Sequence, residues 1–404
     1  MKKSIVVLLM AFTAVSVFAQ KQFEIANEFM SKKGIRLIDK DCSKKLDSNS
    51  SYSLFKGENG KGFAIVANGC VIGYSDESSC DENNIPDVIK SLIKAYSTPT
   101  TKHRSPQVNY PSWYTPKNVK PIPYMIKSKW HQGYPYNAMC PYEDRKQCIA
   151  GCVGVAFAQL MYYYRLPYET NYFFTMSCGN PKNEILPTTF DYDKMFDKYD
   201  EKIHTQENVD AVAKLVYYCA QVVNTSYHWN SACAAWADYI QPNLENIGLF
   251  DEIKWYHVGY DDNPSEEIDT ILNVVDEYLE QGIPLVACGG GHCYIIDGRD
   301  SDGLYHINTG WGDGNWNGHF ILKPSRYDDD WGVNYRYQKY FGFYAFTATR
   351  EFVKTRSASM GVSIPQVDKT NGNVYNMQGK KVGNSLDVLP KGIYIKNGKK
   401  YIVK

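Results

Sequence analysis

Cys152 is the first residue whose type and surroundings could support covalent chemistry. It lies in the run QCIAGCVGVAFAQ, residues 147–159, where the apolar pattern predicts the start of a helix. A thiol at a helix N-terminus faces unpaired backbone N–H groups and the positive end of the helix dipole, and both favour the thiolate. The competing interpretation is a buried structural cysteine, because small thiols are common in protein cores. Other residues must therefore decide whether Cys152 is a nucleophile.

His292 supplies the imidazole that a thiolate nucleophile needs beside it. It follows three glycines, residues 289–291, which would let a substrate or another segment of backbone approach closely. Asn308, in the run YHINTGWG at residues 305–312, is the expected third group that orients the imidazole. His306 shares a strand face with Asn308 by alternation, so the sequence alone leaves it open as an alternative base.

The residues between His292 and Asn308 predict how these two side chains meet. The segment DGRDSDG, residues 297–303, is rich in turn formers, so an antiparallel hairpin centred on Asp300 is expected. In that register His292 and Asn308 are cross-strand neighbours with Cβ atoms roughly 5 Å apart. Cys293 then faces the other side of the strand and does not compete as nucleophile.

The elements that position these residues predict an α+β fold. Helices are expected over residues 150–164, 209–222 and 265–281, and strands over 285–287, 292–296, 304–308 and 319–322. Earlier in the chain, Asn68-Gly69 between two apolar runs indicates a hairpin, and Pro86 begins a further helix. Residues 97–116 are rich in Thr, Ser and Pro and are expected to form an exposed linker that proteases can cut.

Composition excludes several classes of function. Lys and Arg number 44 and Asp and Glu also number 44, so nothing predicts nucleic acid or an acidic membrane as a partner. The 11 cysteines are odd in number, and many are expected to be buried thiols rather than a disulfide framework. Asp-Gly pairs at 302–303 and 313–314 lie where turns are expected, and we predict no metal or organic cofactor.

The N-terminus predicts export. Lys2 and Lys3 precede an apolar run from residue 5 to residue 18, with a cleavage site expected after Ala19. No later segment is long and apolar enough to predict a membrane span. We therefore expect a protein that is secreted or held at the cell surface.

Taken in order, these motifs resemble the streptopain family of papain-like cysteine peptidases. The resemblance covers about residues 20–350 and rests on Gly151-Cys152-Val153, Gly291-His292, His306-Ile307-Asn308, Gly310-Trp311-Gly312 and the approach Lys129-Trp130-His131-Gln132-Gly133. The N-terminal region, notably residues 62–74 and 84–86, is similar to the inhibitory pro-domain of that family.

The resemblance implies a papain-like fold and a role for each matched residue. Cys152 is then the nucleophile, His292 the general base and acid, Asn308 the orienting group, and Gln132 a donor to the oxyanion. Gly291 and Trp311 would contact substrate or shield the site. Two departures stand out, since Gly154-Val155-Ala156 replaces the usual Ala-Thr-Ala and Thr309 replaces the usual Trp. We expect altered subsite packing or a reduced rate from them.

Four segments follow from this interpretation. They are a signal peptide (1–19), an inhibitory pro-domain (20–105), a papain-like catalytic domain (106–356) and a small β module (357–404) that resembles the sorting modules of type IX secretion substrates. The expected activity is that of a cysteine endopeptidase made as a zymogen, acting on proteins or peptides and inhibited by its own pro-domain. The alternatives are an acyl-transferase that uses the same Cys and His, and a surface-binding paralogue with weakened catalysis.

Overall fold

The computed structural model describes most of the chain in segments. They are residues 20–38, 43–45, 51–97, 119–165, 169–170, 174–175, 184–185, 188–199, 204–233, 243, 252–257, 264–289, 292–312, 315–322, 342–347, 374–376, 381–383, 385, 389–390, 392–396 and 399–403. The chain divides into two compact units, residues 1–348 and 349–404. The predicted signal peptide and almost all of the predicted linker lie outside the described residues.

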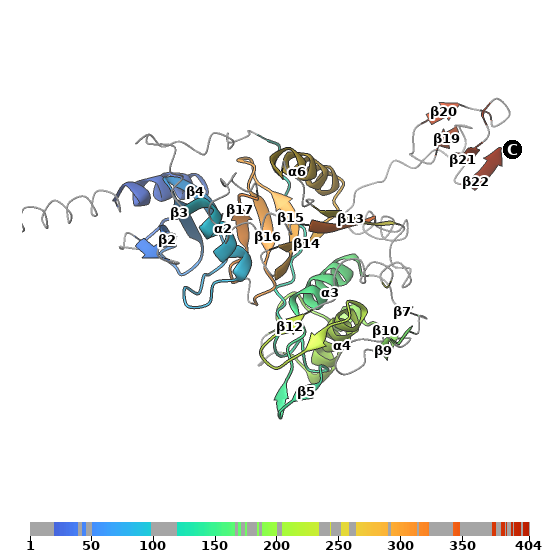
Figure 1. The fold of residues 1–404 in the computed structure, drawn as a ribbon, viewed down its shortest axis with the longest axis horizontal. Coiled ribbons are helices and arrows are strands. Elements are labelled where there is room, and N and C mark those ends of the chain that lie inside the picture. The colour runs from blue at the N-terminus through green and yellow to red at the C-terminus, as the bar shows by residue number, and fades with distance from the viewer. Residues whose placement is uncertain are drawn as a thin grey trace, which may run out of the picture. The chain divides into compact units, whose positions relative to one another are not determined.

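A ten-stranded sheet organises the first unit (Figure 1). Its order is β1-β2-β3-β4-β17-β16-β15-β14-β18-β13, and the pairings are antiparallel. The strands are β1 (Ser43–Lys45), β2 (Ser51–Lys56), β3 (Phe63–Ala67), β4 (Cys70–Ser75), β13 (Glu252–His257), β14 (Leu285–Gly289), β15 (His292–Arg299), β16 (Tyr305–Asn308), β17 (Gly318–Phe320) and β18 (Gly342–Thr347).

Two-stranded ribbons and one short helix complete the irregular parts of this unit. They are β5 (Tyr142–Glu143) with β6 (Lys146–Gln147), β7 (Glu169–Thr170) with β10 (Thr188–Thr189), β8 (Phe174–Thr175) with β9 (Glu184–Ile185), β11 (Ser226–Tyr227) with β12 (Ala232–Cys233), and the 3-10 helix η1 (Tyr192–Lys194).

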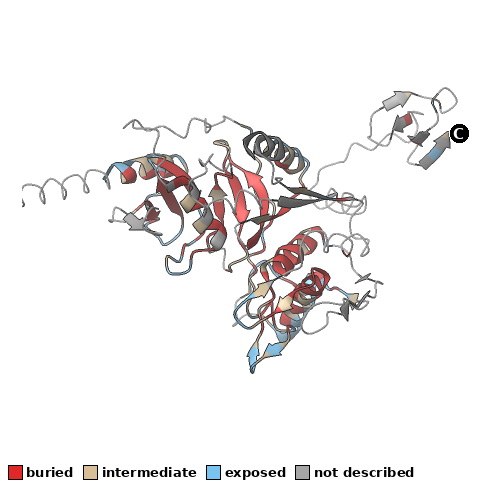
Figure 2. Ribbon diagram, viewed as in Figure 1, coloured by how far each residue is buried: buried red, intermediate tan, exposed pale blue. Residues whose placement is uncertain are grey.

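The helices follow the predicted pattern closely. They are a helix over residues 20–32, α2 (Asp87–Ser97), α3 (Cys152–Tyr164), α4 (Gln206–Val222) and α6 (Pro264–Glu280). The helix at 20–32 was not predicted. Helices α3 and α4 are mostly buried (Figure 2). They pack closely at Gly154, where an added Cβ would lie 2.9 Å from the Cα and Cβ of Ala220. This close approach explains why a glycine replaces the usual alanine at this position.

The N-terminal region shares its sheet and core with the rest of the first unit. Strand β4 pairs with β17, so that Tyr74 faces His319 and Gly73 faces Phe320. An added Cβ at Gly73 would lie 2.3 Å from the Phe320 ring, so a glycine is needed at this crossing. Apolar side chains of β2, β3, β4 and α2 form one buried cluster with those of β14, β15, β16 and α6. The predicted α+β organisation is therefore built on a sheet that runs through both regions.

The predicted hairpin at Asn68-Gly69 is confirmed. The two residues join β3 to β4, with Ala67 opposite Cys70. Both have positive φ, 48° and 77°, as the tight turns of two-residue hairpins require.

The second unit contains a four-stranded sheet in the order β20-β19-β21-β22. Its strands are β19 (Val374–Asn376), β20 (Lys381–Gly383), β21 (Gly392–Lys396) and β22 (Lys399–Val403). Strands β21 and β22 pair antiparallel with Lys396 opposite Lys399, and the Asn-Gly pair between them lies outside the described residues. The predicted β character of the tail is thus present.

Candidate active site

Cys152 is the first residue of α3, as the sequence predicts. Gly151 caps the helix with a φ of 82°, a conformation that L side chains rarely adopt. An added Cβ there would also lie 3.3 Å from Ala232 and 3.4 Å from Thr225, so the space beside Gly151 is tight as well. The backbone N–H of Cys293 donates to Cys152 Sγ at 3.5 Å. The thiol is therefore held at a helix N-terminus and within reach of a second strand.

The surroundings of Cys152 favour its thiolate. Burial by itself would raise the pKa of the thiol. The His292 charge, a hydrogen bond with its imidazole, and the N–H groups of Cys293 and Val153 outweigh burial, so the pKa of Cys152 is lowered. The contrast is Cys219, where burial alone raises the pKa of the thiol. The interaction with His292 thus distinguishes Cys152 from a buried thiol such as Cys219.

His292 begins β15 and interacts with both Cys152 and Thr309. Its Nε2 is 2.7 Å from the main-chain carbonyl oxygen of Thr309. A carbonyl can only accept, so Nε2 carries a proton and Nδ1 is left to face the thiol. This tautomer allows Nδ1 to take the proton of Cys152.

The predicted pairing of His292 with Asn308 is wrong. Strands β15 and β16 do form an antiparallel hairpin, but Asn308 lies opposite Ile295. The turn closes with a hydrogen bond from Asp300 N–H to the carbonyl of Leu304, so it is centred on residue 302 rather than residue 300. A β-bulge between Ile296 and Gly298 then shifts the pairing of the two strands by one more residue. The residue opposite Asn308 is therefore three positions after His292, and the two side chains are not the cross-strand neighbours that the sequence predicted.

Asn308 instead holds the chain beside the imidazole. Its Nδ2 donates to the Ser128 carbonyl at 2.8 Å and lies 3.3 Å from Gln159 Oε1. Its Oδ1 accepts the N–H of Gly310 at 3.1 Å. That N–H belongs to the peptide whose carbonyl accepts from His292, so Asn308 acts on the imidazole through the Thr309–Gly310 peptide.

Gln159 is a site-supporting residue that our sequence interpretation did not single out. It lies on α3, only 1% exposed, and its Oε1 also accepts from Ser128 Oγ at 2.9 Å and from Trp130 N–H at 3.3 Å. The sequence signal that could have identified it was a glutamine seven residues after Cys152, on the same face of an otherwise apolar helix. Gln159 joins the helix that begins at Cys152 to the loop that contacts the His292 imidazole.

The remaining predicted residues lie around this centre. The Trp311 ring packs edge-on against His292, with centroids 6.2 Å apart. The main-chain carbonyl of Gln132 accepts a hydrogen bond from the Ala150 N–H at 3.0 Å. The Gln132 backbone therefore lies beside the residues that immediately precede Cys152. Gly291 lies outside the described residues.

His306 is paired with a buried carboxylate. Its Nδ1 lies 2.6 Å from Asp297 Oδ1, and its ring stacks on Tyr124 with centroids 4.4 Å apart. Asp297 in turn accepts the N–H of Ile126 at 2.6 Å, so the pair anchors the segment that enters the catalytic region. His292, by contrast, is among the groups that interact with the Cys152 thiol.

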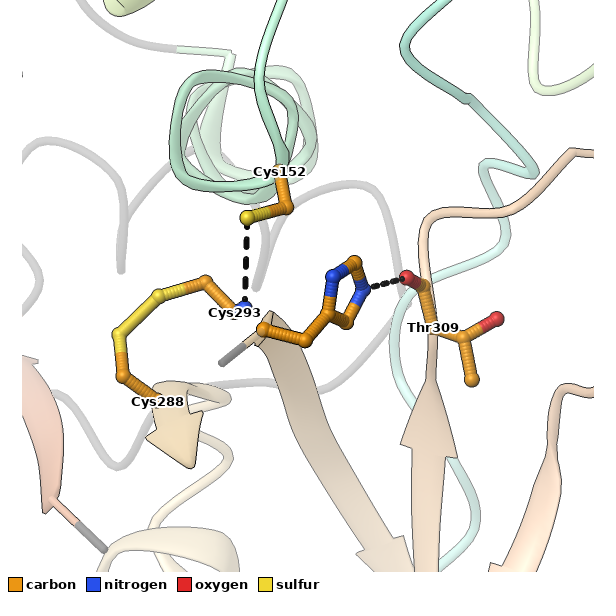
Figure 3. The surroundings of a disulfide bond; sticks show 5 residues. Cys152, Cys288, Cys293 and Thr309 are labelled. Atoms are coloured by element: carbon orange, nitrogen blue, oxygen red, sulfur yellow. Dashed lines mark hydrogen bonds between the residues drawn. A yellow bond between two sulfur atoms is a disulfide. The ribbon is translucent and has the colours of Figure 1, made fainter. Parts of the chain in front are cut away.

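The cysteines follow the expectation of mostly free thiols. Among the described cysteines, Cys288 and Cys293 form a disulfide across β14 and β15 (Figure 3), while free thiols remain at Cys70, Cys80, Cys140, Cys148, Cys152 and Cys219. The disulfide removes Cys293 as a competing nucleophile. Within the part of the chain that the structure describes, no group of three His, Cys, Asp or Glu side chains could hold a metal ion.

A cavity of about 810 Å³ opens beside Trp311. His131, Tyr199 and His204 contribute rings to its wall, and Ser79 of the N-terminal region lies at its edge. The N-terminal region also binds the loop before β17, which contains the cavity residue Asn315. The backbone N–H of Trp316 donates to the Ser79 carbonyl at 3.0 Å, and the backbone N–H of Asp81 donates to Asn315 Oδ1 at 3.1 Å.

Comparison with known proteins confirms the resemblance expected from the motifs. Residues 130–320 match the model of the Peptidase C10 family, and residues 13–99 match that of the Spi protease inhibitor. Streptopain of Streptococcus pyogenes serotype M28 (strain MGAS6180) is 25% identical over 327 residues, which cover 73% of this chain and 79% of streptopain. The thiol protease/hemagglutinin PrtT of Porphyromonas gingivalis is 23% identical over 345 residues, 76% of this chain and 38% of PrtT.

A solved structure shares the fold. A fragment of Prevotella intermedia prointerpain A superposes with a TM-score of 0.57 at 20% sequence identity, covering 75% of this chain and 97% of the fragment. The predicted papain-like α+β fold is confirmed by this likeness. No helix among the described residues is long and apolar enough to cross a membrane.

Proposed function

Because residues 130–320 belong to the Peptidase C10 family of cysteine peptidases, we propose that the chain is the precursor of a secreted cysteine endopeptidase. The observation that carries the proposal is the Cys152 thiol at a helix N-terminus, with its pKa lowered by the neighbouring His292. An ion pair of this kind is what nucleophilic attack on a peptide carbonyl requires.

In the proposed reaction, the Cys152 thiolate attacks the carbonyl carbon and forms a tetrahedral adduct. The oxyanion accepts a hydrogen bond from the backbone N–H of Cys152 and, we propose, from the side chain of Gln132. The His292 imidazolium then gives its proton to the leaving amine, and the C–N bond breaks. Water, deprotonated by His292, attacks the acyl-enzyme and releases the acid with the thiolate restored.

Asn308 keeps a positioning role in this proposal, although not by direct contact with His292. Its amide oxygen holds the Gly310 N–H, and the carbonyl of the same peptide accepts from the imidazole. Trp311 shields the His292 side chain, and the cavity beside Trp311 is the proposed place for substrate on the leaving-group side.

The N-terminal region is the proposed intramolecular inhibitor. It resembles the Spi protease inhibitor, and it contacts the loop that borders the cavity through Ser79 and Asp81. Lys33 adds ion pairs of 3.0 Å with Asp300 and with Asp302 at the turn between β15 and β16. Maturation then requires a cut between this region and the catalytic region, which we place at residues 97–116.

We further propose export directed by residues 1–19, a pro-domain at 20–105, a catalytic domain at 106–356 and a separate β module at 357–404. The module is expected to serve sorting rather than catalysis, since it contains none of the proposed site residues. A chain ending at Ser357 should therefore keep full peptidase activity. Failure of that shortened chain to fold would contradict a separate module.

The test of the function uses the full chain and its Cys152→Ala variant. Both are incubated with casein, with and without an irreversible cysteine-peptidase inhibitor. We expect casein cleavage and self-processing from the natural chain, neither from the variant, and loss of cleavage with inhibitor. Equal cleavage by the variant would refute the assignment of Cys152, and folded natural chain without any cleavage would favour the weakened binding paralogue.

A further inference from the structure

The group that accepts from His292 is a main-chain carbonyl, and such a carbonyl is held only as firmly as its own residue. Thr309 provides it and is fully buried. The chain turns sharply just after Thr309, because Gly310 has a φ of 68°. What fixes Thr309 therefore decides where the carbonyl points.

Asn317 fixes Thr309 from the residue that precedes β17. Its Oδ1 accepts the backbone N–H of Thr309 at 2.9 Å and lies 3.0 Å from Thr309 Oγ1. The same hydroxyl lies 3.0 Å from the carbonyl oxygen of Asn315, so its one proton is shared between two acceptors. Asn317 is itself 5% exposed, so water does not compete strongly for these bonds.

We propose that Asn317 is a positioning residue for the peptidase reaction. Its side-chain oxygen holds Thr309 so that the Thr309 carbonyl accepts from Nε2 of His292 and the other imidazole nitrogen faces Cys152. The inference rests on the proposed function, and it adds a residue that neither the motifs nor the family resemblance pointed to.

The physical effect is on the protonated imidazole. Before proton transfer the Thr309 carbonyl selects the tautomer that can accept from the thiol. After transfer it accepts a charge-assisted hydrogen bond, which is about twice as strong as a neutral one. The groups that face the imidazole include the Cys152 sulfur from α3, the Thr309 carbonyl from the loop and the Trp311 ring. Among these only the carbonyl is a neutral acceptor for Nε2, so a change in its direction weakens the ion pair directly.

The experiment compares three substitutions at one position. Asn317→Ala removes the acceptor, and Asn317→Gln moves it by one methylene. Asn317→Asp keeps an acceptor oxygen at the same distance from the backbone. Asn243→Ala is the matched control, because Asn243 is also buried and donates from its amide to a main-chain carbonyl, that of Val222, away from His292.

Two readouts are measured on each variant. The first is the pH dependence of iodoacetamide alkylation of Cys152 in the full-length precursor, with the Cys152→Ala chain subtracted as background. The second is kcat and KM on a peptide substrate after maturation by added natural enzyme, with active sites counted by an irreversible inhibitor.

For Asn317→Ala and Asn317→Gln we expect kcat to fall about tenfold with KM nearly unchanged. A loss of about this size is what weakening a hydrogen bond to a charged group produces. Alkylation at neutral pH should slow, and its midpoint should move to higher pH. Asn317→Asp should recover most of both losses, and Asn243→Ala should change stability alone. If the Asn317→Ala variant does not fold, comparing Asn317→Gln with Asn317→Asp gives the same test.

Unchanged kcat and an unchanged alkylation profile in the Ala or Gln variant would overturn the proposal. A loss that Asp does not recover, or that Asn243→Ala reproduces, would reduce Asn317 to a structural residue. A folded natural chain without Cys152-dependent cleavage would instead refute the proposed function. The alkylation profile still tests the geometry in that case, so the two failures are distinguishable.

Discussion

Replacing Gln159 with leucine should destabilise the catalytic region and disturb the base at the same time. The Gln159 oxygen is the acceptor for Ser128 Oγ, Trp130 N–H and Asn308 Nδ2. Leucine has a similar volume and offers no acceptor. After the substitution the Ser128 hydroxyl can rotate to another acceptor, and the Asn308 amide still donates to the Ser128 carbonyl. The backbone N–H of Trp130, however, loses its hydrogen bond to Gln159.

The magnitude follows from these losses. An unsatisfied buried N–H costs about 1–3 kcal/mol, and each other lost hydrogen bond costs about 1 kcal/mol net. Burial of an apolar side chain in place of the amide offsets part of this. We expect the free energy of unfolding to fall by about 3 kcal/mol, with a loss of activity in the folded fraction because Asn308 no longer has a fixed partner on α3.

Urea unfolding of the Gln159→Leu chain, in a Cys152→Ala background that prevents self-cleavage, measures the change. Gln206→Leu is the control, because Gln206 lies exposed at the start of α4 and should change the free energy by less than about 0.5 kcal/mol. A decrease below about 1 kcal/mol for Gln159→Leu would refute the reasoning. It would mean that the Trp130 N–H finds another acceptor.

Three further predictions test other parts of the structure. Because the pKa of Cys152 is lowered and that of Cys219 is raised, iodoacetamide at neutral pH should label Cys152 first, as peptide mapping would show; equal labelling of the two thiols would contradict the ion pair. Gly154→Ala should lower the free energy of unfolding by about 1 kcal/mol, because overpacking against α4 at 2.9 Å outweighs the gain in helix propensity; a higher melting temperature would contradict this. Lys33→Met should speed maturation severalfold in a gel time course, because it removes both ion pairs with the turn between β15 and β16, and an unchanged rate would show that these pairs do not hold the pro-domain.

Patterns confined to short segments predicted much of this molecule. The start of α3 at Cys152 and the hairpin at Asn68-Gly69 both follow from nearby residues, because caps and two-residue turns are decided by local backbone conformation. Cys152 and His292 were likewise singled out from residue types and glycine spacing, and the two side chains do interact.

The register of β15 against β16 could not be read from the sequence. Turn residues extend from Asp297 to Gly303, so they fix that a turn exists but not which residue is its centre. The structure centres the turn on residue 302, closed by the bond between Asp300 and Leu304, and adds an irregularity after Ile296. This shift placed Asn308 opposite Ile295 rather than His292, and the Thr309 carbonyl accepts from His292 instead.

The sequence by itself determined which groups could carry the chemistry, since a thiol at a helix start and a histidine after three glycines are local features. Only the tertiary structure decided how the base is oriented. That orientation depends on Asn308, Gln159 and Asn317, which come from a strand, a helix and a loop and meet through hydrogen bonds with main-chain groups. Backbone N–H and C=O groups are the same in every residue, so their pairing leaves no mark in the sequence and appears only when the chain is folded.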